Sequence, residues 1–487
     1  MKSLDAKLSP FQLLDEPMLS FAPGAGPDVD IHPLKGLLRF GPYSTDVLAT
    51  YTPELRVVLI GPAGGQAQVV SLLRNLHGQQ PATGTAGYVP DFPGFERVFK
   101  IALKSTHKAH YIAWPEQLGA MNGEGREQDK LVHAFQDALA RLDLIREQFD
   151  VAVVHIPDHW LAVSNSDTFN AHDVFKAMGA RAGIPTQVLN DRVFTYARSA
   201  PAAVAWRISI ALYVKAGGIP WKLAPMAGVP EGTAYIGLAY ALRTVNDKAH
   251  FVTCCSQVFD MDGGGMQFVA FEARDPVNDA AAARHNPFLS RADMRAVMAR
   301  SLALYRQRNG GALPTRLVVH KTTPFSTDEL SGLRDATSGV VEVECMSVGE
   351  QAGWRGVWMI RDQYGAKSSA KPVKPDGYPV PRGVLQAKSE TSFLLWVAGN
   401  APSASSKGGY FQGGKGIPRP LLVTRQAGSG DFGLIGQEIL ALTKMDWNND
   451  ALYDPVPVTI GYSRRLARAI ANVPDLPGTS YPYRLFM

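Results

Sequence analysis

The chain has 487 residues, too many for one ordinary hydrophobic core, and a length of about 150 residues per domain predicts about two to three domains. Hydrophobic residues make up 46% of the sequence and charged residues 19%, so packed domains are expected and a disordered chain is excluded. The formal charge of +5 is too small for histone-like binding but allows one basic surface. The three cysteines, two of them adjacent, suit neither a disulfide framework nor a zinc site and indicate a reducing compartment. No signal peptide and no run of roughly 18 apolar residues is present, so a cytoplasmic protein without a membrane span is expected.

The first half of the chain alternates strand-like and helix-like stretches. Residues 56–61 and 151–157 are β-branched runs that end in Gly or Pro, as buried parallel strands do. Between them, residues 126–149 carry an apolar stripe at helical spacing. The stripe consists of Leu131, Phe135, Leu139, Leu142 and Leu144. Further helices are expected at 171–182 and 202–216, and this order of elements predicts a doubly wound α/β unit.

A Pro-rich stretch at 218–230 marks the expected domain boundary. Three strand candidates follow in a row at 234–242, 250–259 and 265–273. The next expected elements are a helix at about 290–308, a strand at 316–320, a helix opened by Ser326 with Glu329 in capping-box spacing, and a strand at 340–345. Three strands followed by alternating helices and strands predict a ribonuclease H-like sheet.

Four polar side chains form a candidate anion site. His172 and Lys176 are four residues apart on the helix expected at 171–182, so they share one face. Gln187 follows a Gly-Ile-Pro turn, and Lys215 closes the next helix. Two lysines, a histidine and a glutamine supply the cations and neutral donors that a terminal phosphate requires. Each also has an ordinary alternative, as a satisfied core histidine, a solvated lysine or a cation at a helix C-terminus.

These stretches resemble a known family. The run HDVFK from His172 to Lys176, the run GIPTQ that ends at Gln187, and ALYVKAGGIPWKL around Lys215 resemble the MID domain of short prokaryotic Argonautes. LDEPMLSF, FGPYS and FPGFE are similar to the N-terminal portion of that family, and AYIGLAYAL, the Cys-Cys strand, SLALYRQRNGGALPTRLVVHKT and SFLLWVAGN resemble its PIWI domain. The resemblance covers nearly the whole chain in order and leaves no room for a PAZ domain. It implies an N-terminal segment plus a doubly wound MID domain at 1–228 and a ribonuclease H-like PIWI domain at 229–487.

The resemblance also assigns roles to the candidate anion site. It implies that His172, Lys176, Gln187 and Lys215 hold the 5′ phosphate of a guide RNA. It further implies that the terminal carboxylate of Met487 lies beside this phosphate, where the two anions would share a Mg²⁺ ion. A frayed tail is the alternative, which the aromatic residues in the final YPYRLFM disfavour.

Two positions that carry catalytic aspartates in the family hold other residues here. The pattern YIGxD of the first PIWI strand is matched by a run with Ala239 in place of Asp, and the Asp expected after a later strand is matched by Thr322. A slicing PIWI domain needs several acidic or His ligands for its pair of Mg²⁺ ions, so the resemblance implies a protein that binds without cutting. The nearby Asp260 and Asp262 are expected to be turn residues.

Basic charge is concentrated in the loop-rich segment 363–420, where eight Lys or Arg face only Asp376 and Glu390. With Tyr410 and other aromatic residues interleaved, this segment is a candidate lining for a nucleic-acid duplex channel, and a solvated loop is the alternative. Three arginines, at 464, 465 and 468, lie on an expected C-terminal helix. The candidate backbone contacts are Lys367, Lys371, Lys374, Arg382, Arg464 and Arg468.

The function implied by the resemblance is guide-directed recognition without enzymatic activity of the chain itself. A 5′-phosphorylated short guide RNA would pair with a complementary target, of which single-stranded DNA is favoured, in a channel between the domains. Short Argonautes work with a separate APAZ-domain protein fused to an NAD-consuming Toll/interleukin receptor-type or sirtuin-like domain. The expectation is therefore a heterodimer in antiviral and anti-plasmid defence, which forms a higher oligomer on activation. An active guide-directed nuclease and a structural subunit with a vestigial pocket are the alternatives.

Overall fold

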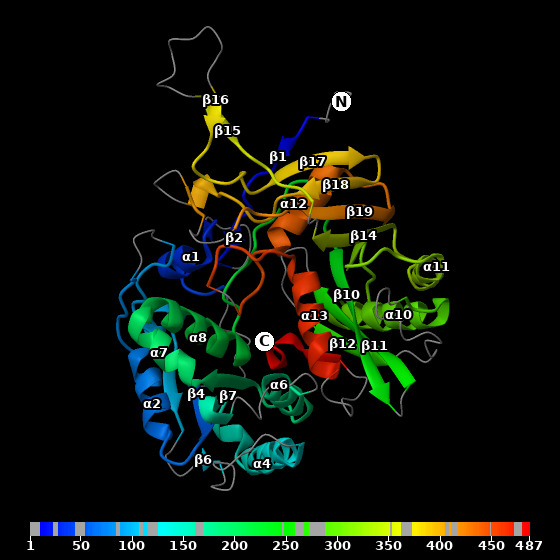
Figure 1. Ribbon diagram of the computed structural model, residues 1–487. Coiled ribbons are helices and arrows are strands. Elements are labelled where there is room, and N and C mark those ends of the chain that lie inside the picture. Colours follow the sequence, from blue (N-terminus) through cyan, green and yellow to red (C-terminus); the bar gives the residue numbers. More distant parts are fainter. Residues whose placement is uncertain are drawn as a thin grey trace.

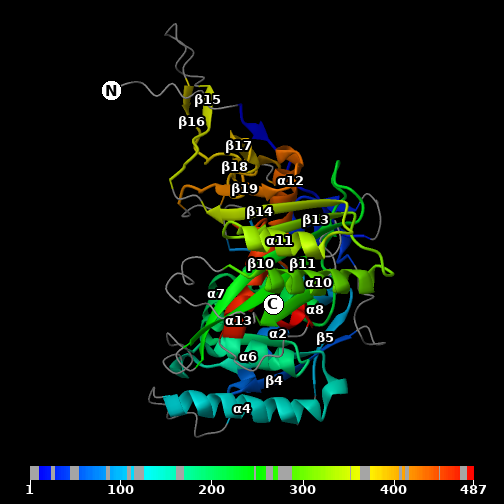
Figure 2. The same ribbon diagram turned by 90° about the vertical axis from the view of Figure 1, so that its right-hand side faces the viewer.

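The computed structural model contains two α/β domains, which lie one above the other along the long axis of the molecule (Figures 1 and 2). The first domain, blue to green in Figure 1, lies at the bottom, and the second domain lies at the top. The residues that the structure describes are 10–22, 28–43, 54–83, 88–106, 111–114, 125–160, 169–245, 248–258, 267–272, 288–350, 353–361, 373–404, 409–411, 416–448, 450–471 and 480–487.

The first domain is built on a parallel sheet with the strand order β5-β4-β7-β8, and a short strand, β6, pairs with the end of β4. The strands are β4 (Glu54–Gly61), β5 (Ala102–Ser105), β6 (Ile112–Ala113), β7 (Val151–Ile156) and β8 (Thr186–Asn190). The helices are α1 (Pro33–Phe40), α2 (Gln66–Asn75), α3 (Phe95–Phe99), α4 (Gly125–Asp143), α6 (Ala171–Arg181), α7 (Asp191–Ser199) and α8 (Pro201–Lys215), with 3-10 turns η3 (Arg146–Gln148) and η4 (Asp158–Trp160). Val57 and Leu59 of β4 pack in one core with α2 and α8, whereas Val58 and Ile60 pack in a second core with α4 and α6. A core on each face of a parallel sheet confirms the predicted doubly wound unit.

The helix predicted at 126–149 ends earlier in the structure. It stops at Asp143, and the 3-10 turn η3 follows. Leu144, the last member of the predicted stripe, is 85% exposed, whereas the other four members are buried. The prediction for Leu144 is wrong because helical spacing places no residue on a face beyond the last helical turn.

The second domain is built on a ten-stranded sheet with the order β1-β17-β18-β19-β14-β13-β10-β11-β12-β20. Its strands are β1 (Gln12–Leu13), β10 (Thr233–Val245), β11 (Lys248–Val258), β12 (Gln267–Glu272), β13 (Arg316–Lys321), β14 (Glu342–Glu350), β17 (Val384–Ser389), β18 (Ser392–Leu395), β19 (Leu421–Ala427) and β20 (Ser480–Pro482). Strands β10, β11 and β12 pair antiparallel, and β13 and β14 then join β10 in parallel. This is the predicted ribonuclease H-like arrangement. The expected turn at 260–265 lies outside the described residues.

Helices cover both faces of this sheet. They are α10 (Arg291–Arg308), α11 (Thr327–Ala336), α12 (Phe432–Leu442) and α13 (Val458–Ala471), with 3-10 turns η5 (Pro402–Ala404) and η6 (Tyr483–Leu485). Leu238 of β10 packs with α10 and α11, whereas Ala239 packs with α13 on the opposite face. The predicted capping box of Ser326 and Glu329 opens α11. Helix α13 lies so close to β10 that a Cβ atom at Gly237 would collide with the carbonyl oxygen of Thr459.

The N-terminal segment crosses between the domains. The N-terminal segment, predicted to belong with the first domain, contributes β1 to the edge of the ten-stranded sheet, where it pairs with β17. It then continues into a three-stranded sheet of β2 (Leu19–Ser20), β3 (Val29–Asp30) and β9 (Lys222–Leu223).

A further two-stranded sheet of β15 (Met359–Arg361) and β16 (Val373–Pro375) projects from the far end of the second domain (Figures 1 and 2).

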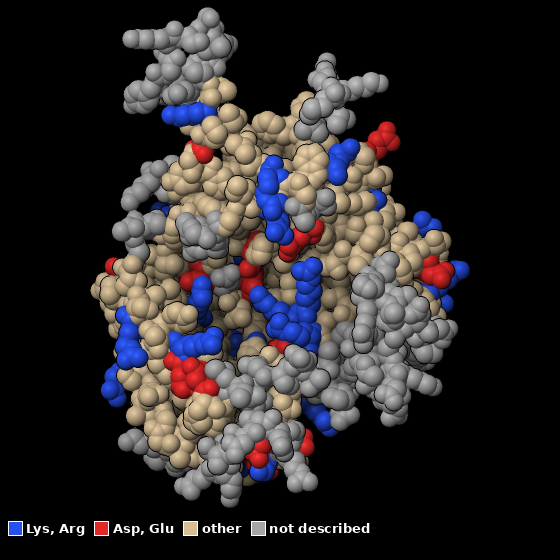
Figure 3. Space-filling view, in the orientation of Figure 1, with Lys and Arg blue, Asp and Glu red and all other residues tan. Residues whose placement is uncertain are grey.

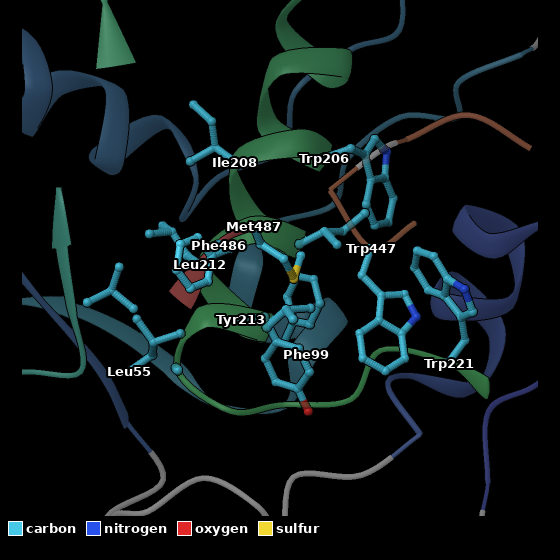
Figure 4. Packing of buried hydrophobic residues seen from close by; sticks show 14 of the residues in the cluster. Leu55, Phe99, Trp206, Ile208, Leu212, Tyr213, Trp221, Trp447, Phe486 and Met487 are labelled. Atoms are coloured by element: carbon cyan, nitrogen blue, oxygen red, sulfur yellow. The ribbon is translucent and has the colours of Figure 1, made fainter. Parts of the chain in front are cut away.

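The two domains share one hydrophobic core. Figure 4 shows Trp206 and Tyr213 of α8 close to Trp447 of the second domain and to Phe486 and Met487 at the chain end. All five side chains are at most 4% exposed. The junction between the domains is therefore packed like a protein interior. Among the described residues, no helix is both long and apolar enough to cross a membrane.

Candidate nucleic-acid interface

The structure brings the two predicted lysines and the predicted glutamine together beside this shared core. Lys176 projects from the middle of α6, Gln187 from β8, and Lys215 from the last residue of α8. Lys215 Nζ donates to Gln187 Oε1 at 2.8 Å, and Lys176 Nζ donates to the main-chain oxygen of Phe486 at 3.2 Å. Both lysines are buried, with exposed fractions of 8% for Lys176 and 1% for Lys215.

Neither ammonium group has an anionic partner within the described part of the chain. Burial and the nearby Arg465 lower the pKa of Lys176 to about 7. Burial, Lys176 and Arg465 together lower the pKa of Lys215 well below its usual value. Burying a cation without an ion pair is costly, so a cluster of such groups marks a site that an anion would stabilise.

His172 lies at the open side of this cluster. Its side chain is 46% exposed, and its Nδ1 lies 3.1 Å from Oδ1 of Asp173. Partial loss of hydration and the ammonium groups of Lys176 and Lys215 lower the pKa of His172, while the hydrogen bond to Asp173 acts in the opposite direction. The imidazole therefore shares the electrostatic environment of the two lysines.

Helix α13 of the second domain adds arginines to the same place. Arg465 is held by Asp446, with a 3.2 Å contact between Nη1 and Oδ1 and a second contact between Nη2 and Oδ2, and Arg468 Nε donates to Asp173 Oδ2 at 2.7 Å. Arg464, which the sequence ranked with Arg468, is exposed. Arg465 is the arginine whose charge acts on both lysines. The sequence places Arg465 on this helix with Arg464 and Arg468, but it gives no information on the rotation of the helix against α6, so the proximity of Arg465 to the two lysines could not be predicted.

Figure 3 shows where this basic surface lies. Lys and Arg atoms gather in a hollow near the middle of the face, in the region that α6, α13 and the chain end occupy in Figure 1. The cluster of Lys176, Lys215, Arg465 and Arg468, with Gln187 and His172, is called the anion pocket below. It is built from both domains, since α6 and α8 belong to the first and α13 to the second.

The end of the chain lies beside the anion pocket. Met487 is 1% exposed and packs in the shared core, so the alternative of a frayed tail is not what the structure has. The contact between Lys176 Nζ and the Phe486 oxygen puts the last peptide group at the pocket. The Mg²⁺ site implied by the resemblance, with the Met487 carboxylate and a guide phosphate as ligands, stays a prediction. Within the described ranges, no cluster of three or more His, Cys, Asp or Glu side chains could hold a metal ion.

The two positions at which the resemblance implies a lost catalytic aspartate, Ala239 and Thr322, lie at the end of the pairing between β10 and β13. Strand β10 pairs with β13, and the last pair is Leu238 with Lys321. Ala239 follows Leu238 in the sequence, and Thr322 follows Lys321. Ala239 is 6% exposed and packs in the core towards α13. Lys321, on the opposite face, is fully buried in an ion pair with Glu329 at 2.6 Å. Asp260 and Asp262 lie outside the described residues.

The predicted lining of a duplex channel divides into three outcomes. Lys367 and Lys371 lie outside the described residues, and Lys374 is exposed on β16. Arg382 is a correction: it is 4% exposed and donates through Nε to Glu16 at 3.0 Å. A guanidinium group that is buried in an ion pair inside the protein cannot reach a phosphate backbone. Tyr410 is likewise buried, at 7% exposed.

The similarity of this chain to known proteins lies in its structure. Neither a protein-family model nor a curated protein sequence matches this chain. Among solved structures, the chain is similar to Clostridium butyricum Argonaute bound to a guide DNA and a 19-mer target DNA, with a TM-score of 0.68 and 16% sequence identity over 98% of this chain and 54% of that one. It is also similar to Aa-Ago with externally bound siRNA, with a TM-score of 0.62 and 15% identity over 98% of this chain and 56% of that one.

The chain has an Argonaute fold. Both domains take part in the match, so the predicted architecture of a MID domain followed by a ribonuclease H-like PIWI domain is confirmed. The chain spans about half the length of these solved Argonautes. In these terms, the anion pocket lies between the MID domain and helix α13 of the PIWI domain.

Proposed function

We propose that this chain binds a short guide strand by its 5′ phosphate and uses the guide to recognise a complementary nucleic acid. The observation that carries the proposal is the pair of buried lysines, Lys176 and Lys215, which lack an anionic partner in the described structure. A terminal phosphate would supply the missing negative charge, with Arg465 and His172 as further donors. Sequence would then be read by base pairing and not by side chains.

Binding of matched RNA oligonucleotides with a 5′ phosphate and a 5′ hydroxyl tests this proposal. The phosphorylated RNA should bind more tightly, and Lys176→Ala or Lys215→Ala should weaken it roughly 10- to 100-fold, the range expected for a lost charge-assisted hydrogen bond. Lys130→Ala removes an exposed lysine of α4 that has no role in the proposed site and is the control. Equal affinities of the lysine variants and the unchanged protein would contradict the proposal and would support a structural subunit with a vestigial pocket.

The guide-bound protein is proposed to bind its target without cleaving it. The adjacent Ala239 and Thr322 offer no carboxylate where two metal-binding acids would be needed. Incubation of the loaded protein with labelled target in Mg²⁺ or Mn²⁺ should leave the target intact. Discrete product bands would refute this part and favour the alternative of an active guide-directed nuclease.

The chemical nature of guide, target and metal is carried over from the resemblance to short Argonautes. An RNA guide and a single-stranded DNA target are proposed, with Mg²⁺ at the guide phosphate and the carboxylate of Met487. The ion would neutralise part of the charge between the two anions. Competition among the four guide and target combinations, with and without a chelator, distinguishes these choices.

An effector partner completes the proposal. The chain is proposed to pair with an APAZ-domain protein that carries a Toll/interleukin receptor-type or sirtuin-like NADase, and target pairing would activate the complex, with formation of a higher oligomer. Co-expression with the protein encoded by the neighbouring reading frame tests this: NAD loss that requires both guide and target supports it. A complex that does not form, or NAD loss independent of target, counts against it.

A further inference from the structure

One buried acidic residue, Asp173, lies among the basic residues of the anion pocket. Asp173 is 3% exposed, although a phosphate bound beside it would repel its carboxylate. Oδ1 lies 3.1 Å from His172 Nδ1, and Oδ2 accepts from Arg468 Nε at 2.7 Å. One carboxylate therefore fixes a histidine of the MID domain and an arginine of the PIWI domain.

The position of Asp173 in the first turn of α6 does not account for the direction of its carboxylate. Acidic residues are common in first turns because they interact with the helix dipole. Here, however, Asn170 is the N-cap, and its side-chain oxygen accepts from the main-chain nitrogen of Asp173 at 3.1 Å. The Asp173 carboxylate is directed instead at the imidazole and the guanidinium group.

The contact with Asp173 limits the protonation states in which His172 can bind an anion. The pKa of Asp173 is lowered, since His172 and Arg468 outweigh the effect of burial, so the carboxylate is ionised and only accepts hydrogen bonds. Nδ1 of His172 must then carry the proton. In a neutral ring, Nε2 would hold a lone pair, which repels a phosphate oxygen. Only the imidazolium form donates to both anions.

We propose that Asp173 is a positioning residue that holds the proton of His172 on Nδ1, so that binding of a 5′ phosphate is accompanied by uptake of a proton at Nε2. The inference rests on the proposed guide site. A neutral amide at position 173 would remove the requirement, because it can donate to Nδ1 and leave a proton on Nε2 of a neutral ring. Asp173 thereby links the affinity for phosphorylated guides to pH.

The groups that face His172 determine the direction of the effect. On α6 these are Asp173 and Lys176, on α8 Lys215, and on α13 Arg468, which acts through Asp173. Partial desolvation and the two ammonium groups lower the pKa of the ring in the free protein, which favours the neutral form before binding. A dianionic phosphate favours the charged form. Preference for the phosphorylated guide should therefore fall as pH rises above neutrality.

Calorimetry in pairs of buffers with different ionisation enthalpies measures the number of protons taken up on binding. The informative quantity is the difference between 5′-phosphorylated and 5′-hydroxyl RNA of the same sequence, measured near pH 7.5. The unchanged protein should show an excess of up to about one proton assigned to His172. Asp173→Asn and the half-exposed His172→Gln should each remove this contribution, and the double variant should remove no more. Asp173→Glu should retain it, and Asp335→Asn, in an exposed ion pair with Arg291, is the control.

Lys176 is the competing source of protons, because its pKa of about 7 also allows uptake. The charge of Asp173 also acts on Lys176, so His172→Gln is the variant that separates the two sources. If Lys176 is the source, the proton excess will be unchanged in His172→Gln, and this outcome overturns the inference. A purely structural role of Asp173 would weaken both RNAs equally without a change in the proton count, which overturns it as well. If the unchanged protein does not distinguish the two RNAs at all, the proposed guide site itself fails.

Discussion

Replacement of Lys176 by methionine should stabilise the guide-free protein and weaken guide binding at the same time. Methionine has a similar length and leaves no buried charge, whereas Lys176 is buried beside Arg465 with one hydrogen bond, to Phe486. A pKa moved from 10.5 to about 7 corresponds to roughly 5 kcal/mol, at about 1.4 kcal/mol for each pH unit. The lost hydrogen bond offsets about 1 kcal/mol of this. A net gain of about 2–4 kcal/mol is expected at pH 6, because relaxation of the protein around the buried ammonium group recovers part of the penalty.

The pH dependence of the free energy of unfolding shows independently whether the charge of Lys176 destabilises the fold. Between about pH 7 and pH 10.5 the unfolded state binds the Lys176 proton and the folded state does not, so the free energy of unfolding rises with pH over this window. Below about pH 7 both states are protonated and the full penalty applies. Lys176→Met should remove this rise, so that the two proteins converge in stability as the pH approaches 10.

Denaturant unfolding of the guide-free proteins at pH 6, 7.5 and 9 is the assay, together with thermal shifts on addition of 5′-phosphorylated RNA. The guide should stabilise the variant less than the unchanged protein, since stabilisation grows with the ratio of ligand concentration to Kd. Lys321→Met is the matched control: this buried lysine pairs with Glu329 at 2.6 Å, so its loss leaves an unpaired carboxylate and should cost about 3–5 kcal/mol. A Lys176→Met protein that is less stable than the unchanged protein at pH 6 would refute the electrostatic reasoning.

Three further substitutions test other parts of the structure. Glu16→Gln should destabilise the fold by about 3–5 kcal/mol in denaturant unfolding, since it leaves Arg382 and Lys444 buried without their anion. Burial raises the pKa of Glu16, but the two cations outweigh it and hold the pKa below its usual value, so the contribution of the carboxylate is lost as pH falls and the two proteins should converge in stability in acid. A stability difference that does not change with pH would argue against it. Gly237→Ala should lower the melting temperature and weaken guide binding, because its Cβ pushes α13 away from β10, and an unchanged melting temperature would contradict the close packing. Ala239→Asp alone should restore no target cleavage in Mg²⁺ or Mn²⁺, since the adjacent Thr322 still provides no carboxylate, and product bands would show that one acid suffices.

The sequence predicted the individual helices and strands better than the contacts between them. The strands at 56–61 and 316–320 and the capping box at Ser326 follow from local patterns, and the structure confirms them. Leu144 was placed wrongly because the end of α4 depends on where its packing surface ends. Periodicity also contains no information on which distant segments pair, so the pairing of β1 with β17 could not be foreseen.

The candidate site shows the same division. Lys176, Gln187 and Lys215 were chosen from residue type and spacing, and the structure brings them together. Arg382 was chosen on charge alone, but its neighbourhood is set by Glu16, 366 positions earlier in the chain. The participation of Arg465 and Asp173 depends on the rotation of α13 against α6, which is a property of tertiary packing. Their charges were visible in the sequence, but their partners were not.

Helix α13 connects two distant parts of the molecule. Its fourteen residues extend over about 21 Å. Near one end, Thr459 contacts His320 and lies against Gly237, and towards the other end Arg468 binds Asp173 of the MID domain. One helix thus makes both the closest approach to the central strand of the PIWI sheet and the ion pair with Asp173 of the MID domain.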